Sequence, residues 1–159
     1  MPDEQPAGGG AGVLLARAAN ALARRTRAAL KPHGLSAAQY LLLAGLESPR
    51  DGVPGGRPAG RSQVRLAARL GMDRAMASTV LAQLERRRLI ARPPAADRRA
   101  RAPALTRAGR ARLAAARPAV EAAEVGFLAA LRSELPGFAV MLRILLGERP
   151  RLRASAVRG

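Results

Sequence analysis

The sequence predicts a mainly helical protein with one small β-hairpin, and three observations lead to this fold class. The only aromatic residues are Tyr40, Phe127 and Phe138, so the core has to be built from aliphatic side chains, which favours packed helices. Apolar residues recur at spacings of three and four along most of the chain. Prolines and glycines divide this pattern into separate segments.

Two helices are predicted in the first part of the chain. Apolar residues at helical spacing predict a helix over 13–30, which ends where residues 31–34 bring a proline and then a glycine. Ser36 followed by Gln39 is the pattern of a capping box, in which the two side chains satisfy free backbone N–H groups at a helix start. A second helix is therefore expected to run from this point to about Ser48.

The middle of the chain has the pattern of a helix-turn-helix. Prolines and glycines are frequent in residues 49–61, which indicates a loop. Ser62 is positioned to cap a short helix over 63–70, and Asp73 is positioned to cap a helix over 74–87. Two helices joined by a short turn that contains glycine are typical of DNA-binding helix-turn-helix units.

A wing and two further helices are predicted after this unit. Two short extended arms around a polar tip in residues 91–105 predict a β-hairpin, by position more than by composition. Thr106 is positioned to cap a long helix that Pro118 bends and that ends near Ser133, and a last helix is expected over 136–146. Apolar residues near the C-terminus have the spacing of a helix-packing seam: Leu128, Leu131, Leu135, Phe138, Leu142 and Leu145.

The predicted helix 74–87 has two different faces. One face is apolar and is expected to pack on the preceding helix and the core: Ala77, Val80, Leu81 and Leu84. The other face carries Arg74, Ala75, Ser78, Thr79, Ala82 and Arg86. Arginine and hydroxyl side chains donate to base edges and phosphates when a helix N-terminus enters the major groove. An ordinary solvated helix face is the alternative interpretation.

The positive charge of the chain is concentrated in one stretch. The formal net charge is +17, and 27 of the 28 basic residues are arginine. Sixteen of these arginines lie between Arg57 and Arg117, where only three acidic residues occur. A local excess of positive charge is expected of a protein that contacts nucleic-acid phosphates. A GC-rich genome is the alternative explanation of the total arginine content.

Composition excludes several kinds of chemistry. The chain has no cysteine and His33 is its only histidine, so thiol nucleophiles, disulfides, Cys/His zinc sites and histidine relays are excluded. We therefore expect no enzyme, no metal site and no cofactor. No apolar run approaches the roughly 20 residues that span a bilayer, and residues 1–12 lack a signal-peptide core. A cytoplasmic protein without a membrane partner is expected.

Five segments occur in the order and spacing of a known family: residues 66–74, 81–87, 89–92, 97–99 and 105–109. They resemble the helix-turn-helix, the wing and the entry into the fifth helix of the MarR family. Upstream, Gly34-Leu35-Ser36 with Gln39 resembles that family's second helix. The fold class is therefore expected to be mainly α with a small β-wing, as a winged helix-turn-helix plus a helical dimerisation region formed by both termini.

The resemblance implies a homodimer that binds double-stranded DNA. In the family the first, fifth and sixth helices of the two chains intertwine, and the two recognition helices enter successive major grooves of a pseudo-palindrome. An Asp-x-Arg wing pairs its carboxylate with an arginine that reaches the minor groove. Asp97 and Arg99 correspond to that pair, with Arg98 beside them. The candidate DNA-binding residues are Ser62, Gln63, Arg74, Ala75, Ser78, Thr79, Arg86, Asp97, Arg98 and Arg99.

The chain departs from the family pattern at several positions. Ala75 and Met76 stand where small hydroxyl residues are common, and Thr79 stands where an arginine is frequent. These differences reduce the number of groups for base readout. Arg88 stands where a glycine usually follows the fourth helix, and a positive φ at this position costs an arginine about 1 kcal/mol. The loop over 49–61 is longer than usual.

The expected function is that of a MarR-type regulator that represses transcription by occluding its operator. A small-molecule effector, an anion or a phenolic compound, is expected to release it. The main alternative is a sequence-tolerant architectural DNA-binding protein, because the charge is high and the reading face has few hydroxyls. Another is a protein-interaction module without DNA binding. His33 and Tyr40 are interpreted as a loop residue and a core residue rather than as effector ligands.

The predicted organisation has five parts. They are a disordered leader (1–12), an N-terminal dimerisation helix (13–35), a winged helix-turn-helix DNA-binding region (36–106), C-terminal dimerisation helices (107–147) and a basic tail (148–159).

Overall fold

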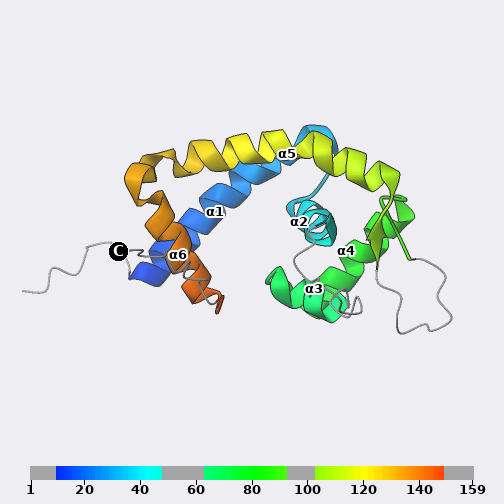
Figure 1. Cartoon of the computed structure of the whole chain (residues 1–159), viewed down its shortest axis with the longest axis horizontal. Coiled ribbons are helices and arrows are strands. Elements are labelled where there is room, and N and C mark those ends of the chain that lie inside the picture. Colours follow the sequence, from blue (N-terminus) through cyan, green and yellow to red (C-terminus); the bar gives the residue numbers. More distant parts are fainter. Residues whose placement is uncertain (1–9, 48–62, 93–102, 149–159) are drawn as a thin grey trace, which may run out of the picture. The chain divides into compact units, whose positions relative to one another are not determined.

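The computed structural model describes residues 10–47, 63–92 and 103–148 of the chain. Its elements are α1 (Ala11–Leu30), η1 (Lys31–His33), α2 (Ala37–Glu47), α3 (Gln63–Arg69), α4 (Arg74–Arg86), β1 (Ile90–Ala91), β2 (Ala104–Leu105), α5 (Arg107–Leu128), η3 (Ala129–Glu134) and α6 (Leu135–Leu145) (Figure 1). The chain divides into two compact units, Met1–Glu124 and Val125–Gly159. The predicted fold class, mainly helical with a small two-stranded sheet, is confirmed.

Helix α1 begins earlier than predicted and ends where the sequence indicates. It begins at Ala11, so residues 11 and 12 are helical and the predicted leader is wrong for them; residues 1–9 lie outside the described part of the chain. The carbonyl oxygen of Gly10 accepts the backbone N–H groups of Val13 and Leu14 at 2.8 and 3.3 Å, so helical hydrogen bonding begins before Val13. The 3-10 turn η1 contains Pro32 and is followed by Gly34, whose φ is 61°. Glycine adopts this conformation without the strain of a side chain, so the chain turns here.

The predicted capping box begins α2. Ser36 Oγ accepts the backbone N–H of Gln39 at 3.2 Å, and Gln39 Oε1 accepts the backbone N–H of Ser36 at 3.1 Å. The two bonds satisfy groups that have no partner within the helix. The helix is described as far as Glu47, and the predicted loop over 49–61 lies outside the described residues.

Helices α3 and α4 form the predicted helix-turn-helix. Each ends one residue earlier than predicted, at Arg69 and Arg86. Gly71 in the turn has a φ of 65°, which glycine accepts readily. Asp73 Oδ1 accepts the backbone N–H of Met76 at 2.7 Å, so the predicted cap of α4 is confirmed.

Strands β1 and β2 form the base of the predicted wing. They are antiparallel, with Ile90 opposite Leu105, and β1 starts one residue before the predicted range. After β2, the hydroxyl of Thr106 donates to the carbonyl oxygen of Arg88 at 2.8 Å and accepts the backbone N–H of Gly109 at 3.0 Å. A Cβ at Gly109 would lie 1.9 Å from the carbonyl oxygen of Leu89, so this close approach of α5 to the chain before β1 requires glycine.

The core of the unit Met1–Glu124 is aliphatic, as predicted. Its largest fully buried side chains come from α1, α2, α4, β1 and α5: Leu30, Leu42, Leu43, Leu81, Leu84, Ile90, Leu113 and Val120. Tyr40 is partly buried and packs against this cluster. The core therefore joins the recognition helix α4 to both α2 and α5.

The C-terminal helices differ from the prediction. Helix α5 ends at Leu128 instead of near Ser133. In the following turn η3, Arg132 has a φ of 46° and a ψ of −119°, which interrupts the helical hydrogen-bond pattern. The leucine seam lies on separate helical segments, as the predicted end near Ser133 and restart at 136 imply, but the first segment ends earlier than predicted. Helix α6 has Pro136 in its first turn, as predicted.

One part of the C-terminal region has the composition of a membrane span. The stretch Arg107–Leu145 contains an 18-residue window with a mean hydropathy of 1.4, none of which is buried within the described chain. The lack of long apolar runs in the sequence had predicted no stretch of this composition. The stretch is not a single helix, because Arg132 interrupts it. Helix α6 alone has 11 residues, about 16 Å at about 1.5 Å per residue, which is about half of a bilayer's hydrocarbon thickness.

Arg88 allows a test of backbone strain. Its φ is 55°, so the position does require the conformation that glycine prefers. We expect Arg88→Gly to raise the free energy of unfolding by about 0.5–1 kcal/mol, measured by urea denaturation. The matched control is Arg24→Gly, at an exposed position inside α1, which is expected to lower the free energy by a similar amount. A loss of stability in R88G would contradict the assignment of strain.

Candidate nucleic-acid interface

Helix α4 separates its apolar and polar residues as the sequence predicts. The buried residues are Ala77, Val80, Leu81 and Leu84. The exposed ones include Arg74, Ala75, Ser78, Thr79 and Arg86, while Ala82 is partly exposed. Burial of one face leaves the opposite face, which carries two guanidinium groups, for contacts with other molecules.

Two exposed residues of α4, Thr79 and Met76, offer little hydrogen bonding to a base edge. Thr79 Oγ1 donates to the carbonyl oxygen of Ala75 at 3.0 Å, so its proton is used within the helix. Met76 is 45% exposed in the first turn of α4, although the sequence did not single it out as a contact. Its thioether is at most a weak acceptor, so this exposed position offers no strong hydrogen-bonding group to a base edge.

Several predicted contacts lie outside the described residues. Ser62 directly precedes α3, and Asp97, Arg98 and Arg99 belong to the segment between the two strands of the wing. Gln63 is the first residue of α3. The paired strands β1 and β2 fix the two ends of the segment that carries the wing residues.

A buried polar group connects α4 to α2. The side chain of Gln39 is 8% exposed, and its Nε2 donates to Gln83 Oε1 at 3.1 Å. Arg87, the residue after α4, donates from Nη1 to Gln39 Oε1 at 3.0 Å and from Nη2 to the carbonyl oxygen of Gly34 at 2.9 Å. Sequence reasoning missed this role of Arg87, because its partners lie 48 and 53 residues away.

A second group of polar residues connects α2 to α5. Arg117 hydrogen-bonds the Glu47 carboxylate at the end of α2, and this bond raises the pKa of the arginine. Burial raises the pKa of the nearby Tyr40 hydroxyl, and the positive charge of Arg117 opposes that rise. The packing of Tyr40 against the core agrees with its interpretation as a core residue.

Exposed charges near α4 include one ion pair. Arg92, after β1, lies 3.5 Å from the carboxylate of Glu85 on α4. Both side chains are more than a third exposed, so the pair contributes little to stability. It does reduce the charge that Arg92 offers to a phosphate.

Comparison with known proteins decides the family. No family model matches the chain, and no curated protein matches it. The structure of Rv2887, a Mycobacterium tuberculosis MarR family protein, in complex with salicylic acid is 30% identical in sequence and covers 87% of this chain and 98% of its own, with a TM-score of 0.66. The chain belongs to the MarR family.

Other solved structures are similar to this MarR-family chain. Rv2887 in complex with DNA is 31% identical, covering 87% of this chain and 98% of its own, with a TM-score of 0.64. CouR from Rhodococcus jostii RHA1, bound to p-coumaroyl-CoA, is 26% identical over 85% of this chain and 90% of its own, with a TM-score of 0.71. Bordetella bronchiseptica BpsR, whose DNA binding is regulated by 6-hydroxynicotinic acid, is 26% identical over 91% and 99%, with a TM-score of 0.72.

The family assignment confirms the sequence resemblance. MarR-family proteins are DNA-binding transcriptional regulators with a winged helix fold, and the α3–α4 unit with its two-stranded sheet has that arrangement. The similar proteins identified as MarR family members are regulators rather than enzymes.

Proposed function

We propose that this protein is a transcriptional repressor that binds pseudo-palindromic operator DNA as a homodimer in the cytoplasm. The observation that carries the proposal is the arrangement of α4. Its first turn is capped by Asp73, its apolar face is buried, and its opposite face exposes Arg74 and Ser78. A helix of this kind after a helix-turn-helix turn enters the major groove with its N-terminal residues.

The proposed DNA contacts fall into two groups. On the helix-turn-helix they are Ser62, Gln63, Arg74, Ala75, Ser78, Thr79 and Arg86. In the wing they are Arg98 and Arg99, with Asp97 orienting Arg99. The guanidinium groups contribute mainly to affinity, because phosphate contacts carry no direct sequence information.

The homodimer is supported by apolar residues exposed on the terminal helices. No residue of α6 is buried in the chain, and Met141, Ile144 and Leu145 are each more than half exposed. Val13 on α1 and Val125 on α5 are also more than half exposed. Large exposed apolar patches are uncommon on soluble monomers and mark contact surfaces. We propose residues 13–35 and 107–147 as the dimerisation region and 36–106 as the DNA-binding region.

An effector that releases DNA is a further part of the proposal. Rv2887 in complex with salicylic acid and BpsR regulated by 6-hydroxynicotinic acid support a small aromatic acid as the class of compound. CouR bound to p-coumaroyl-CoA supports a related thioester. The chain itself is proposed to carry out no chemical reaction.

A sequence-tolerant architectural DNA-binding protein is the second candidate. The exposed methyl group of Ala75 and the internally bonded hydroxyl of Thr79 favour it, because both reduce base readout. The high net charge is compatible with either candidate, since phosphate contacts are common to both.

Arg99 provides the test of DNA binding by the wing. We expect Arg99→Gln to weaken binding to a duplex operator and to reduce the slope of log K against log[salt] by about 1, measured by fluorescence anisotropy between 50 and 200 mM salt. Arg143→Gln on α6 makes the same change of charge outside the proposed DNA interface. Its slope of log K against log[salt] should equal that of the unmodified protein. Equal slopes for R99Q and R143Q would reject the wing contact.

Dimerisation is tested by placing charge on α6. Met141→Glu combined with Leu145→Glu changes two exposed residues one helical turn apart. We expect this protein to have half the mass of the unmodified dimer in analytical ultracentrifugation, because burying two carboxylates in an apolar interface is strongly unfavourable. Val64→Glu on α3, at a position 52% exposed, is the control and should stay dimeric. A dimeric double variant would rule out α6 as the interface.

A further inference from the structure

Two arginines from distant parts of the chain meet at the turn between α1 and α2. Arg112 on α5 donates from Nη1 to the carbonyl oxygen of His33 at 2.8 Å. Arg87, directly after α4, donates from Nη2 to the carbonyl oxygen of Gly34 at 2.9 Å. A Cβ on Gly34 would lie 3.7 Å from each of these two nitrogens, so both guanidinium groups lie beside the same residue of the turn. We call Arg87 and Arg112 the arginine pair.

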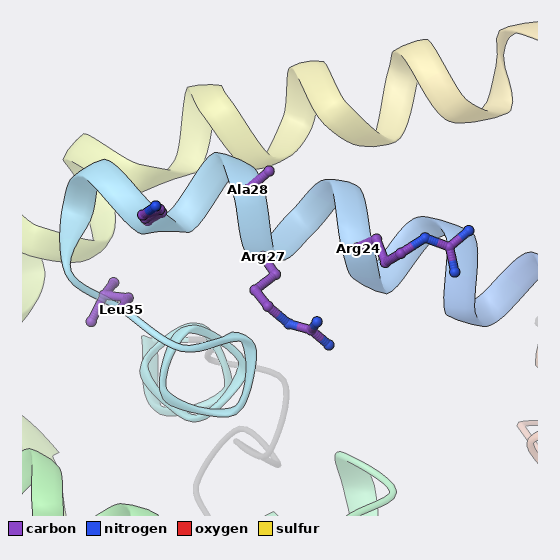
Figure 2. A pocket seen from close by; sticks show the side chains of 5 residues that line it. Arg24, Arg27, Ala28 and Leu35 are labelled. Atoms are coloured by element: carbon purple, nitrogen blue, oxygen red, sulfur yellow. The ribbon is translucent and has the colours of Figure 1, made fainter.

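The turn that receives these bonds is anchored at both ends. Leu30 before it is fully buried, and Leu35 after it is 6% exposed. Figure 2 shows Leu35 where the chain passes from the turn into α2. The last carbonyl groups of a helix have no partner within that helix, so those of His33 and Gly34 are available to arginine side chains. The turn is therefore a fixed point to which other elements can be bonded.

The second nitrogen of Arg87 bonds α2. Nη1 donates to Gln39 Oε1 at 3.0 Å. Gln39 is 8% exposed, and its Nε2 donates to Gln83 Oε1 on α4 at 3.1 Å. Arg87 thus bonds the turn with one nitrogen and α2 with the other. A planar guanidinium holds its nitrogens in a fixed fork, which the single ammonium group of a lysine does not reproduce.

The arginine pair joins the two proposed regions of the chain. Arg87 belongs to the proposed DNA-binding region, 36–106, whereas the turn and Arg112 belong to the proposed dimerisation region, 13–35 and 107–147. The apolar packing of α4 is non-directional, but hydrogen bonds have preferred distances and angles. The bonds of the arginine pair therefore restrict the orientation of α4 more closely than its buried leucines do.

We propose that Arg87 and Arg112 are positioning residues that fix the orientation of the recognition helix α4 relative to α5, and thereby determine which half-site spacing the homodimer accepts. Neither residue touches DNA. The consequence for spacing rests on the proposed function, whereas the orientation of α4 within one chain does not. One inserted base pair moves a half-site by about 3.4 Å and turns it by about 35°, so two recognition helices of fixed orientation distinguish the altered site.

The orientation of α4 is measured first, without DNA. The chain has no cysteine, so Ser78→Cys on α4 and Ala114→Cys on α5, both at exposed positions, introduce the only two sites for spin labels. Double electron–electron resonance on the labelled chain, diluted with an excess of unlabelled protein, gives the distance between the labels within one chain. We expect a narrow distance distribution for this parent protein and a broader one when Arg87→Met or Arg112→Met is added.

Arg110→Met is the matched control for both variants. Arg110 Nη1 donates to the carbonyl oxygen of Leu105, five residues away, at 3.0 Å. The control therefore loses the same kind of bond and the same charge without changing the turn, and its distribution should be as narrow as that of the parent. Equal widths in the parent, R87M, R112M and R110M would overturn the positioning role.

Half-site spacing is tested on an operator that the unmodified protein selects from random duplex. Fluorescence anisotropy compares this operator with versions that have one base pair inserted or removed between the half-sites. We expect the unmodified protein and R110M to bind the altered duplexes about tenfold more weakly than the operator, and R87M and R112M less than about threefold more weakly. A tenfold preference that persists in R87M and R112M would overturn the assignment of spacing to the arginine pair.

Salt dependence separates positioning from contact with a phosphate. An arginine that contacts a phosphate contributes about 1 to the slope of log K against log[salt], so R87M and R112M should keep the slope of the unmodified protein. Arg87→Lys keeps the charge but not the fork, and we expect it to lose the spacing preference as R87M does. A slope reduced by about 1 in R87M, or full spacing preference in R87K, would overturn the proposal.

Failure of the proposed function gives a different result. If the unmodified protein selects no operator, the regulator function fails, while the label distances still decide whether the arginine pair positions α4. If R87M does not fold, R87K replaces it in the distance measurement, where it is expected to broaden the distribution because it lacks the fork. A distribution for R87K as narrow as that of the parent would then overturn the role of Arg87.

Discussion

The burial of one face of α4 is the constraint on which the rest of the DNA-binding unit depends. Leu81 and Leu84 are fully buried, and α4 packs against both α2 and α3. Because these side chains cannot leave the core without loss of about 2–5 kcal/mol each, the opposite face is fixed toward solvent. The exposed groups of Arg74, Ser78 and Arg86 follow from that packing rather than from any polar contact. The same core includes Leu113 of α5, so the position of the reading face also depends on the helix that follows the wing.

Local patterns predicted much of the fold because their hydrogen bonds join residues close in sequence. The caps at Ser36, Asp73 and Thr106 each act on a backbone N–H three residues later, and each is present. A break near Ser133 was predicted from Pro136, but the end of α5 at Leu128 and the positive φ of Arg132 were not, because no glycine or proline stands at either position to signal them. The role of Arg87 could not be predicted either, since the run of three arginines at the end of α4 gives no indication of which one turns toward Gln39. The positive φ at Arg88 was anticipated only through the family's glycine.

Arginines that the sequence alone does not distinguish therefore have different roles in the structure. Arg87 stabilises the contact between α4 and α2, Arg117 bonds Glu47, and Arg112 bonds the η1 turn. These side chains are part of the +17 net charge but are engaged within the chain. Those on the exposed face of α4 remain for phosphates, which supports affinity for DNA in general. In the proposed function, specificity comes from fewer groups, Ser78 among them, together with the wing and the shape of the operator.

One experiment tests most directly whether this protein is a dimeric, sequence-specific regulator. Bound sequences are selected from a random duplex pool, and the selected site then competes against random duplex. A dimeric regulator is expected to select two related half-sites with centres about 10 base pairs apart, and to prefer the selected site to random duplex by more than about 10³. A pool without an enriched motif, or a preference below about 10³, would contradict the claim and identify a sequence-tolerant architectural protein instead.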